Sequence, residues 1–171
     1  MELLILSDSH GRADGIREAL DRQIKRPNAV VFLGDGVRDL DRVELGDVPV
    51  YRVLGNCDLF RFGVADDCRE EEILPIAGHT MLLTHGARYG VKSGLGALIA
   101  YAAKENADLV LYGHTHEPRL DVIPIGTKIG DRTLTREIYL FNPGSIGQGG
   151  SFGTLTLQGN NVLFSHGNLW K

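Results

Sequence analysis

The chain has 171 residues, of which 43% are hydrophobic and 23% charged, and its formal net charge is −4. This length fits one domain with its own core and leaves little room for a second, and the composition is that of an ordinary globular protein. The charge balance excludes a broad basic face for non-specific binding to nucleic acid or anionic lipid. No apolar stretch approaches the roughly 18 residues that a membrane-spanning helix needs.

The N-terminus and the cysteines favour a reducing compartment. Met1-Glu2 leads directly into the apolar run 3–6, which is too short and has the wrong flanks for a signal peptide. The two cysteines, Cys57 and Cys68, are therefore expected to be free thiols, with a disulfide between them as the less favoured alternative. We expect a cytoplasmic protein.

The first two thirds of the chain alternate short apolar strands with helices. The spacing of Ile16, Ala19, Leu20 and Ile24 predicts a helix near 13–25, and Leu95, Leu98, Ile99 and Ala102 predict a second near 92–106. The expected strands are short and apolar, as in sheets buried on both faces. They cover residues 3–6, 30–33, 50–54, 81–83 and 109–112.

From Pro118 onward the pattern changes to short strands separated by turns, which favours antiparallel pairing. The strands expected there cover residues 120–125, 137–141, 152–157 and 162–164, with a turn at Gly130-Asp131. Two sheets packed face to face, with helices outside, would accommodate both halves.

Polar side chains able to bind metal follow the apolar strands at once. They are Asp8, His10, Asp35, Asn56, His85, His114 and His116. Because ligands gather at the carboxyl ends of parallel strands, these groups should meet at one rim. Carboxylate, imidazole and amide ligands suit Mn, Fe, Zn, Ni or Co in sites of five or six ligands. The set is too large for a single ion.

Each part of this pattern also has an ordinary structural interpretation. An Asp after a strand commonly caps a turn or a helix, a Gly-Asn pair commonly forms a tight turn, and a single His is more often a hydrogen-bonded polar residue than a ligand. The conjunction favours metal binding, because four of the six histidines follow apolar runs together with two acids and one amide.

In this order the residues resemble the calcineurin-like metallophosphoesterases. The matching motifs are Asp8-x-His10, Gly34-Asp35, Gly55-Asn56, His85 and Gly113-His114-x-His116. The resemblance is closest to the small bacterial and archaeal phosphodiesterase branch, which shares Gly-Asn-Cys-Asp and a later Asn142-Pro143-Gly144-Ser145. It implies an α/β fold, namely a four-layer α/β/β/α sandwich of two mixed β-sheets flanked by helices, in a single domain (1–171) without a cap domain.

The resemblance also implies a ligand assignment. One ion would be held by Asp8, His10, Asp35 and His116, and the other by Asp35, Asn56, His85 and His114. Asp35 would bridge the two, which is physically reasonable because dications about 3.5–4 Å apart need an anion between them. Manganese is the first expectation, with nickel, iron, zinc or cobalt as alternatives, since such ligands accept several ions.

Water activated by the two ions would attack the phosphorus, so no covalent nucleophile is needed and Ser9 is interpreted as a turn residue. The catalytic candidates are Asn56, Cys57, Asp58 and His114. Many family members have a His directly after the Gly-Asn pair, where this chain has Cys57. A thiol is a weak donor, so Asp58 or a water would take over part of the assistance to the leaving group. The alternative for Cys57 is a small, packed residue.

Other residues near these motifs have weaker assignments. The guanidinium groups of Arg12 and Arg88 could donate paired hydrogen bonds to a phosphate, but arginines in such positions are more commonly exposed to solvent. The glycine-rich run 144–153 lacks a P-loop signature and is expected to form a turn near the rim. His79 and His166 are expected to be structural.

The sequence thus predicts a metal-dependent phosphoesterase, and within that class a phosphodiesterase acting on a small phosphate ester. The alternative is a weakly active or inactive metal-binding scaffold that holds protein partners, as in the eukaryotic retromer subunit that resembles this fold. A third interpretation is a purely structural metal site with saturated ligands. We expect neither a membrane partner nor a nucleic-acid surface, and exposed strand edges favour a homo-oligomer.

Overall fold

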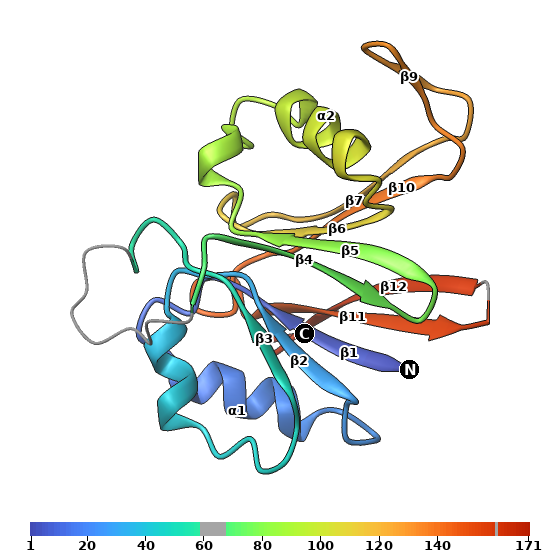
Figure 1. The fold of residues 1–171 in the computed structure, drawn as a ribbon. Coiled ribbons are helices and arrows are strands. Elements are labelled where there is room, and N and C mark those ends of the chain that lie inside the picture. The colour runs from blue at the N-terminus through green and yellow to red at the C-terminus, as the bar shows by residue number, and fades with distance from the viewer. Residues whose placement is uncertain (59–67, 160) are drawn as a thin grey trace.

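The computed structural model describes residues 1–58, 68–159 and 161–171. Two five-stranded sheets lie face to face, with one α-helix on each outer side (Figure 1). This is the four-layer α/β/β/α arrangement of two mixed sheets that the sequence predicts. None of the helices in the described part of the chain is long and apolar enough to span a membrane.

The first sheet has the order β12-β11-β1-β2-β3. Its strands are β1 (Glu2–Leu6), β2 (Ala29–Phe32), β3 (Val50–Arg52), β11 (Ser151–Gln158) and β12 (Asn161–Asn168). Strands β1, β2 and β3 are parallel, whereas β11 runs antiparallel to both β1 and β12. Helix α1 (Ala13–Asp21) connects β1 to β2, and the 3-10 helix η1 (Val37–Arg42) follows β2.

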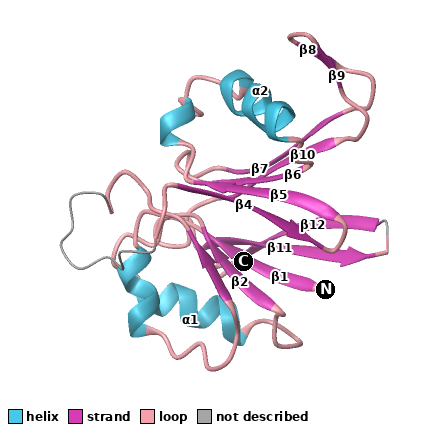
Figure 2. Cartoon of the chain, in the orientation of Figure 1, coloured by secondary structure: helices cyan, strands magenta, loops and turns pink. Residues whose placement is uncertain are grey.

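The second sheet has the order β4-β5-β6-β10-β7. Its strands are β4 (Glu71–Ile76), β5 (His79–Thr84), β6 (Leu109–Tyr112), β7 (Pro118–Ile123) and β10 (Ile138–Pro143). The short 3-10 helix η2 (Ala87–Tyr89) and helix α2 (Gly96–Glu105) connect β5 to β6. A separate hairpin of β8 (Lys128–Ile129) and β9 (Arg132–Thr133) projects beyond α2 (Figure 2).

Alternation along β1 explains why its sheet is buried on both faces. Leu3 and Ile5 pack against the second sheet, whereas Leu4 and Leu6 pack against α1. Successive side chains of a strand point to opposite faces, so an uninterrupted apolar run supplies two cores at once. Strand β6 does the same on the other side, because Val110 packs against α2 and Leu111 faces the first sheet.

Both predicted helices are shorter than expected. Helix α1 ends at Asp21 rather than at residue 25, and Ile24 is fully exposed. Pro27 disfavours helical backbone in the residue before it, which limits how far the helix can run. Helix α2 begins at Gly96 rather than at residue 92, because Gly94 has a φ of 147°, far from helical values.

The described strands after Pro118 pair antiparallel with one another, as expected: β7 with β10, β8 with β9, and β11 with β12. Strand β10 also pairs parallel with β6. Strand β4 was not predicted; its sequence is Glu-Glu-Ile-Leu-Pro-Ile, and it forms an edge of the second sheet. Its two acids and its proline suit an edge strand and hide the apolar pattern of a buried one.

Candidate metal centre

The predicted ligands lie together at the carboxyl ends of the parallel strands, on the left in Figure 1. Asp8 and His10 follow β1, and Asp35 follows β2. On the second sheet His85 follows β5, and His114 and His116 follow β6. The two sheets therefore supply ligands from opposite sides of one site.

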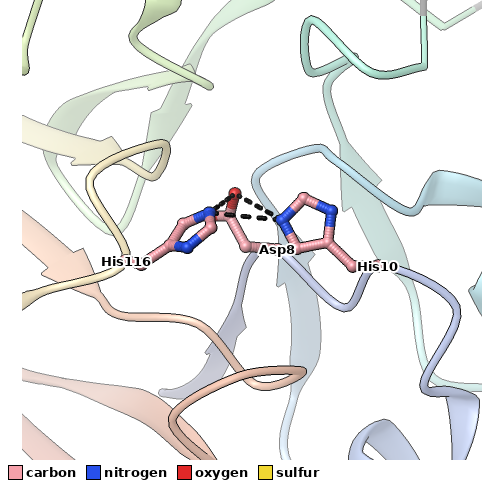
Figure 3. Close-up of side chains that lie close together, drawn as sticks. All are labelled: Asp8, His10 and His116. Atoms are coloured by element: carbon pink, nitrogen blue, oxygen red, sulfur yellow. Dashed lines mark hydrogen bonds and ion pairs between the residues drawn. The ribbon is translucent and has the colours of Figure 1, made fainter.

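A first group consists of Asp8, His10 and His116, which point toward one another in Figure 3. Nε2 of His116 lies 3.0 Å from Oδ1 of Asp8, and Nε2 of His10 lies 3.7 Å from the same oxygen. The two Nε2 atoms are 3.2 Å apart. Ligands placed about 2.0–2.2 Å from a single ion have comparable separations.

The carboxylate of Asp8 is fixed on one side only. Its Oδ2 accepts hydrogen bonds from the Ser7 hydroxyl at 2.5 Å and from the His114 amide at 3.1 Å. Its Oδ1 is buried and, among the described residues, has no hydrogen-bond partner. A buried anionic oxygen without a donor is costly, so its orientation toward two imidazoles fits a bound cation.

A second group consists of Asp35, His85 and His114. Nε2 of His85 lies 3.4 Å from Oδ2 of Asp35 and 3.2 Å from Nδ1 of His114. The same Nε2 lies 3.9 Å from Oδ1 of Asp8, so the two groups adjoin. Asp35 also forms a group with His10 and Cys57, which places its carboxylate between the two sets of ligands.

Hydrogen bonds at the far ring nitrogens orient two of the histidines. Nδ1 of His85 donates to the carbonyl oxygen of Leu33 at 2.7 Å, and Nδ1 of His116 contacts Oε1 of Gln148 at 3.0 Å. An oxygen partner at Nδ1 leaves Nε2 as the coordinating atom. Gln148 belongs to the glycine-rich run that the sequence places near the rim.

Five of these residues have left-handed backbone. The φ values are 56° at Asp8, 48° at His10, 58° at Asp35, 70° at His114 and 63° at His116. Only two other non-glycine residues in the described ranges share this conformation. Residues other than glycine adopt it at a cost, and such strain concentrates at functional sites.

The electrostatics of the second group couple an acid to an imidazole. Burial opposes ionisation of Asp35, but the hydrogen bond and charge of His85 and the Cys57 amide outweigh it and hold the pKa of Asp35 below its ordinary value. Burial likewise opposes protonation of His85, yet Asp35 and Asp8 raise its pKa. Burial, and then the charge of His85, lower the pKa of His114.

Asp58 lies beneath the site rather than in it. Its Oδ2 accepts hydrogen bonds from the amides of Asp35 at 2.7 Å and Gly55 at 2.9 Å. Its Oδ1 accepts from the amides of Gly36 at 2.9 Å and Val37 at 3.2 Å. Because both oxygens are occupied and the side chain is buried, this geometry favours a positioning role over the leaving-group role expected from the sequence.

Asn56 and Cys57 are exposed at the rim, with Nδ2 of Asn56 3.5 Å from Sγ of Cys57. The alternative of a packed, buried Cys57 is therefore wrong. Cys57 also donates its backbone amide to Oδ1 of Asp35 at 2.8 Å. A pocket of about 180 Å³ borders this edge of the site, with Asn56, His85 and Arg88 among its lining residues.

The remaining histidines and Arg12 are structural. His79 pairs with Asp108 at 2.8 Å, and His166 bonds the carbonyl of Asn142 at 2.8 Å while stacking on Phe141. Arg12 donates to the carbonyl of Gly147 at 3.2 Å.

Sequence reasoning missed two supports of the metal loops. Asp39 in η1 accepts hydrogen bonds from the Ser9 hydroxyl at 2.5 Å and from the Gly11 amide at 2.7 Å, so Ser9 is a turn residue as expected. Ser145 donates its hydroxyl to the Asp8 carbonyl at 2.8 Å. The Asn-Pro-Gly-Ser motif was a signal for Ser145, whereas nothing in the sequence distinguishes Asp39 from a solvated acid.

Residues 1–160 match the sequence model of the calcineurin-like phosphoesterase superfamily domain. The chain belongs to this superfamily. Members use divalent metal ions, and the ligand groups of this chain fit that chemistry. The probable metallophosphoesterase YsnB of Bacillus subtilis is 29% identical over 146 residues, which is 85% of this chain and 75% of the relative.

Solved structures give the superfamily fold independent support. A conserved Streptococcus pneumoniae protein, predicted to be a phosphoesterase, has a TM-score of 0.75 at 24% identity, covering 98% of this chain and 89% of its own. Vacuolar Protein Sorting 29 from Cryptosporidium parvum has a TM-score of 0.70 at 21% identity, and the match covers 98% of this chain and 97% of that protein. An archaeal phosphodiesterase has a TM-score of 0.65 at 18% identity, and the match covers 97% of this chain and 99% of that protein.

Proposed function

We propose that this phosphoesterase-superfamily chain is a phosphodiesterase that binds two divalent ions, bridged by Asp35. Two ions bound there would supply an activated water and positive charge for the reacting phosphate. The observation that carries the proposal is the buried, unpartnered Oδ1 of Asp8, which faces His10 and His116. The membership of Asp35 in two ligand groups supports its bridging role.

Some residues of the chain would hold the ions, and others would lie beside the substrate. Asp8, His10 and His116 would hold one ion, and His85, His114 and Asn56 the other. The Leu33 carbonyl and Gln148 keep the imidazoles of His85 and His116 in the coordinating orientation. Asn56 adds a neutral ligand at the exposed edge, and Cys57 beside it faces the departing group.

Preference for diesters follows from charge. A phosphomonoester carries two negative charges and profits from a cationic imidazole, which this chain lacks after its Gly-Asn pair. A diester carries one negative charge, so an uncharged thiol at Cys57 is less of a disadvantage. The likeness to an archaeal phosphodiesterase supports the same choice.

Reconstitution with Mn²⁺ tests the proposal. We expect two ions per chain by elemental analysis and turnover of bis(4-nitrophenyl) phosphate. Asn56→Ala and His114→Ala should abolish turnover while the protein stays folded, because the sandwich has cores that do not include these residues. A ratio that never exceeds one ion per chain would refute the two-ion site. Full activity in either variant would refute the assignment of Asn56 and His114 to the second ion.

The alternative function is a metal-binding scaffold for protein partners, favoured by the likeness to Vacuolar Protein Sorting 29. It predicts metal binding without turnover of any diester. The complete ligand set favours the enzyme. A homo-oligomer, a cytoplasmic location and a single domain without a cap remain predictions.

A further inference from the structure

A second cavity lies at the other end of the strands that carry the metal ligands. It has a volume of about 470 Å³ and is bounded by the end of α2, the segment 132–136, the start of β5 and the residues just before β6. Thr80 and Asp108 line it, whereas His85 and His114 follow the opposite ends of the same two strands. The cavity is therefore separate from the metal centre, and its volume lies within the usual range for small-molecule sites.

Two arginines line this cavity, and each is fixed to the framework through a single nitrogen. Nη1 of Arg132 donates to the carbonyls of Ala103 at 3.0 Å and Lys104 at 3.1 Å. Nη1 of Arg136 donates to the carbonyl of Gly78 at 3.2 Å and lies 3.5 Å from Oδ2 of Asp108. Within the described ranges, Nε and Nη2 of both side chains make no further hydrogen bond. Each guanidinium thus keeps two donors, the edge that binds phosphate or carboxylate in pairs.

The residues that line the cavity include two arginines and one carboxylate. Asp108 is the one carboxylate among the lining residues, and it is buried. It accepts the Thr80 amide at 2.7 Å and pairs with His79 at 2.8 Å. It also forms an ion pair with Nη1 of Arg136 at 3.5 Å, so two arginines against one carboxylate leave the cavity with a net positive charge.

The rest of the wall is apolar or carries hydroxyl groups. Ala107 and Ile138 are buried side chains of the cavity wall, and Leu134 packs against the same core as they do. Thr133 and Thr135 lie on either side of Leu134. A ligand with an anionic group and a small apolar body could contact both the arginines and the apolar wall.

We propose that this cavity binds a small organic phosphate monoester, with the phosphate on Arg132 and Arg136 and the apolar body against Ala107, Leu134 and Ile138. A phosphate monoester suits two guanidiniums better than a carboxylate does, because it carries up to two negative charges and its three terminal oxygens can accept paired hydrogen bonds from both arginines. The proposal does not depend on the hydrolytic activity of the metal centre.

Titration of the metal-loaded protein with phenylphosphonate, a non-hydrolysable monoester mimic, tests the site. Amide shifts in a ¹⁵N-correlated NMR spectrum locate the ligand. We expect shifts at Ala107, Asp108 and residues 133–135, distinct from any at His85 and His114. Inorganic phosphate should bind the cavity at least about tenfold more weakly, since it lacks the apolar body.

Charge-matched variants make the test specific. Arg136→Gln should weaken binding in the cavity at least about tenfold, because it removes a charge-assisted pair of hydrogen bonds. Arg119→Gln is the control, since Arg119 lies in β7, pairs with Asp121 at 2.6 Å and does not line the cavity. Arg132→Gln also removes contacts to the end of α2, so thermal unfolding must be measured beside binding.

Loss of the cavity shifts in Arg136→Gln, with an unchanged metal content and an unchanged Arg119→Gln control, would establish the site. Shifts confined to the metal loops, no shifts at millimolar ligand, or equal affinity in Arg136→Gln would overturn it. Equal affinity for inorganic phosphate would overturn the assignment of the apolar wall.

Discussion

Cys57 directly follows the Gly-Asn pair, where the resemblance to the superfamily implies a histidine in many members. Its amide donates to Asp35, and its Sγ shares a ligand group with His10 and Asp35. A side chain so close to the proposed bridging carboxylate is placed to influence the departing oxygen. A thiol donates weakly, so an enzyme that relies on it should depend strongly on how easily that oxygen leaves.

Cys57→His should therefore raise the ratio of monoester to diester turnover by about tenfold and reduce the dependence of rate on leaving-group pKa. An imidazole can be cationic near neutral pH and can donate a proton. The measurement is kcat/KM for a series of aryl and alkyl phosphates, with metal content determined alongside. If both ions are retained and neither quantity changes, another residue controls specificity.

Asp58 was a candidate catalytic acid in the sequence, but in the structure it holds the loops that carry the predicted ligands Asp35 and Asn56. Asp58→Asn replaces one acceptor oxygen by a donor that faces backbone amides, so we expect about 1–3 kcal/mol lower free energy of unfolding. Metal content and activity should fall together. If Asp58 instead acted as a proton donor, stability and metal content would persist while kcat fell and one limb of the pH profile disappeared.

At the scale of elements, the strand-to-loop junctions depend on glycines that leave room for the ligands. A Cβ at Gly113, directly after β6, would lie 2.1 Å from Oγ of Ser7 and 2.9 Å from Oδ2 of Asp8. The two loops after β1 and β6 can meet only because this Cβ is missing. Gly55 holds the equivalent place after β3, where a Cβ would lie 2.1 Å from Oδ1 of Asp35.

Gly113→Ala should lower metal affinity at least about tenfold and destabilise the protein by about 1–3 kcal/mol, because the loops must separate. Gly96→Ala is the matched control: Gly96 begins α2, and a Cβ there meets nothing within 4 Å. Isothermal titration with Mn²⁺ and thermal unfolding of both variants check the prediction. Equal losses in the two variants would show that the effect is not steric crowding of the centre.

The titratable residues of the candidate metal centre couple folding to pH. Without metal, the lowered pKa of Asp35 contributes stability above the ordinary value of 3.8, and this is lost as pH falls through the folded pKa. The raised pKa of His85 contributes stability below the ordinary value of 6.5, and this is lost as pH rises through the folded pKa. The pair therefore stabilises metal-free protein most between these two values.

Thermal unfolding between pH 6 and 9 should thus change in opposite directions with and without metal. The melting temperature of EDTA-treated protein should fall as His85 loses its proton. That of Mn²⁺-loaded protein should rise, because imidazole ligands bind metal only when deprotonated. Parallel trends in the two samples would contradict a metal site built on these histidines.

Residue patterns alone predicted the layer order, most strand positions and the side chains that meet at the candidate metal centre. Uninterrupted apolar runs such as 3–6 and 109–112 supply both faces of a buried strand, and the polar residues directly after them must lie at the strand ends. Both signals are local, so no knowledge of distant contacts was needed. His85 and His116 were predicted as ligands from their own positions after apolar runs, although the residues they meet lie far along the chain.

The roles of the supporting residues depend on contacts that form only in the folded chain. From the sequence Asp58 is a candidate catalytic acid, but in the structure its carboxylate accepts hydrogen bonds from four backbone amides of two loops. Asp39 looks like a solvated acid in the sequence, but in the structure it accepts hydrogen bonds from Ser9 and Gly11. The edge strand β4 and the cavity beside Arg132 and Arg136 likewise arise from packing between segments far apart in sequence. Hydrogen bonds across such separations leave no periodic trace, because any polar residue can make them once the fold brings a partner within reach.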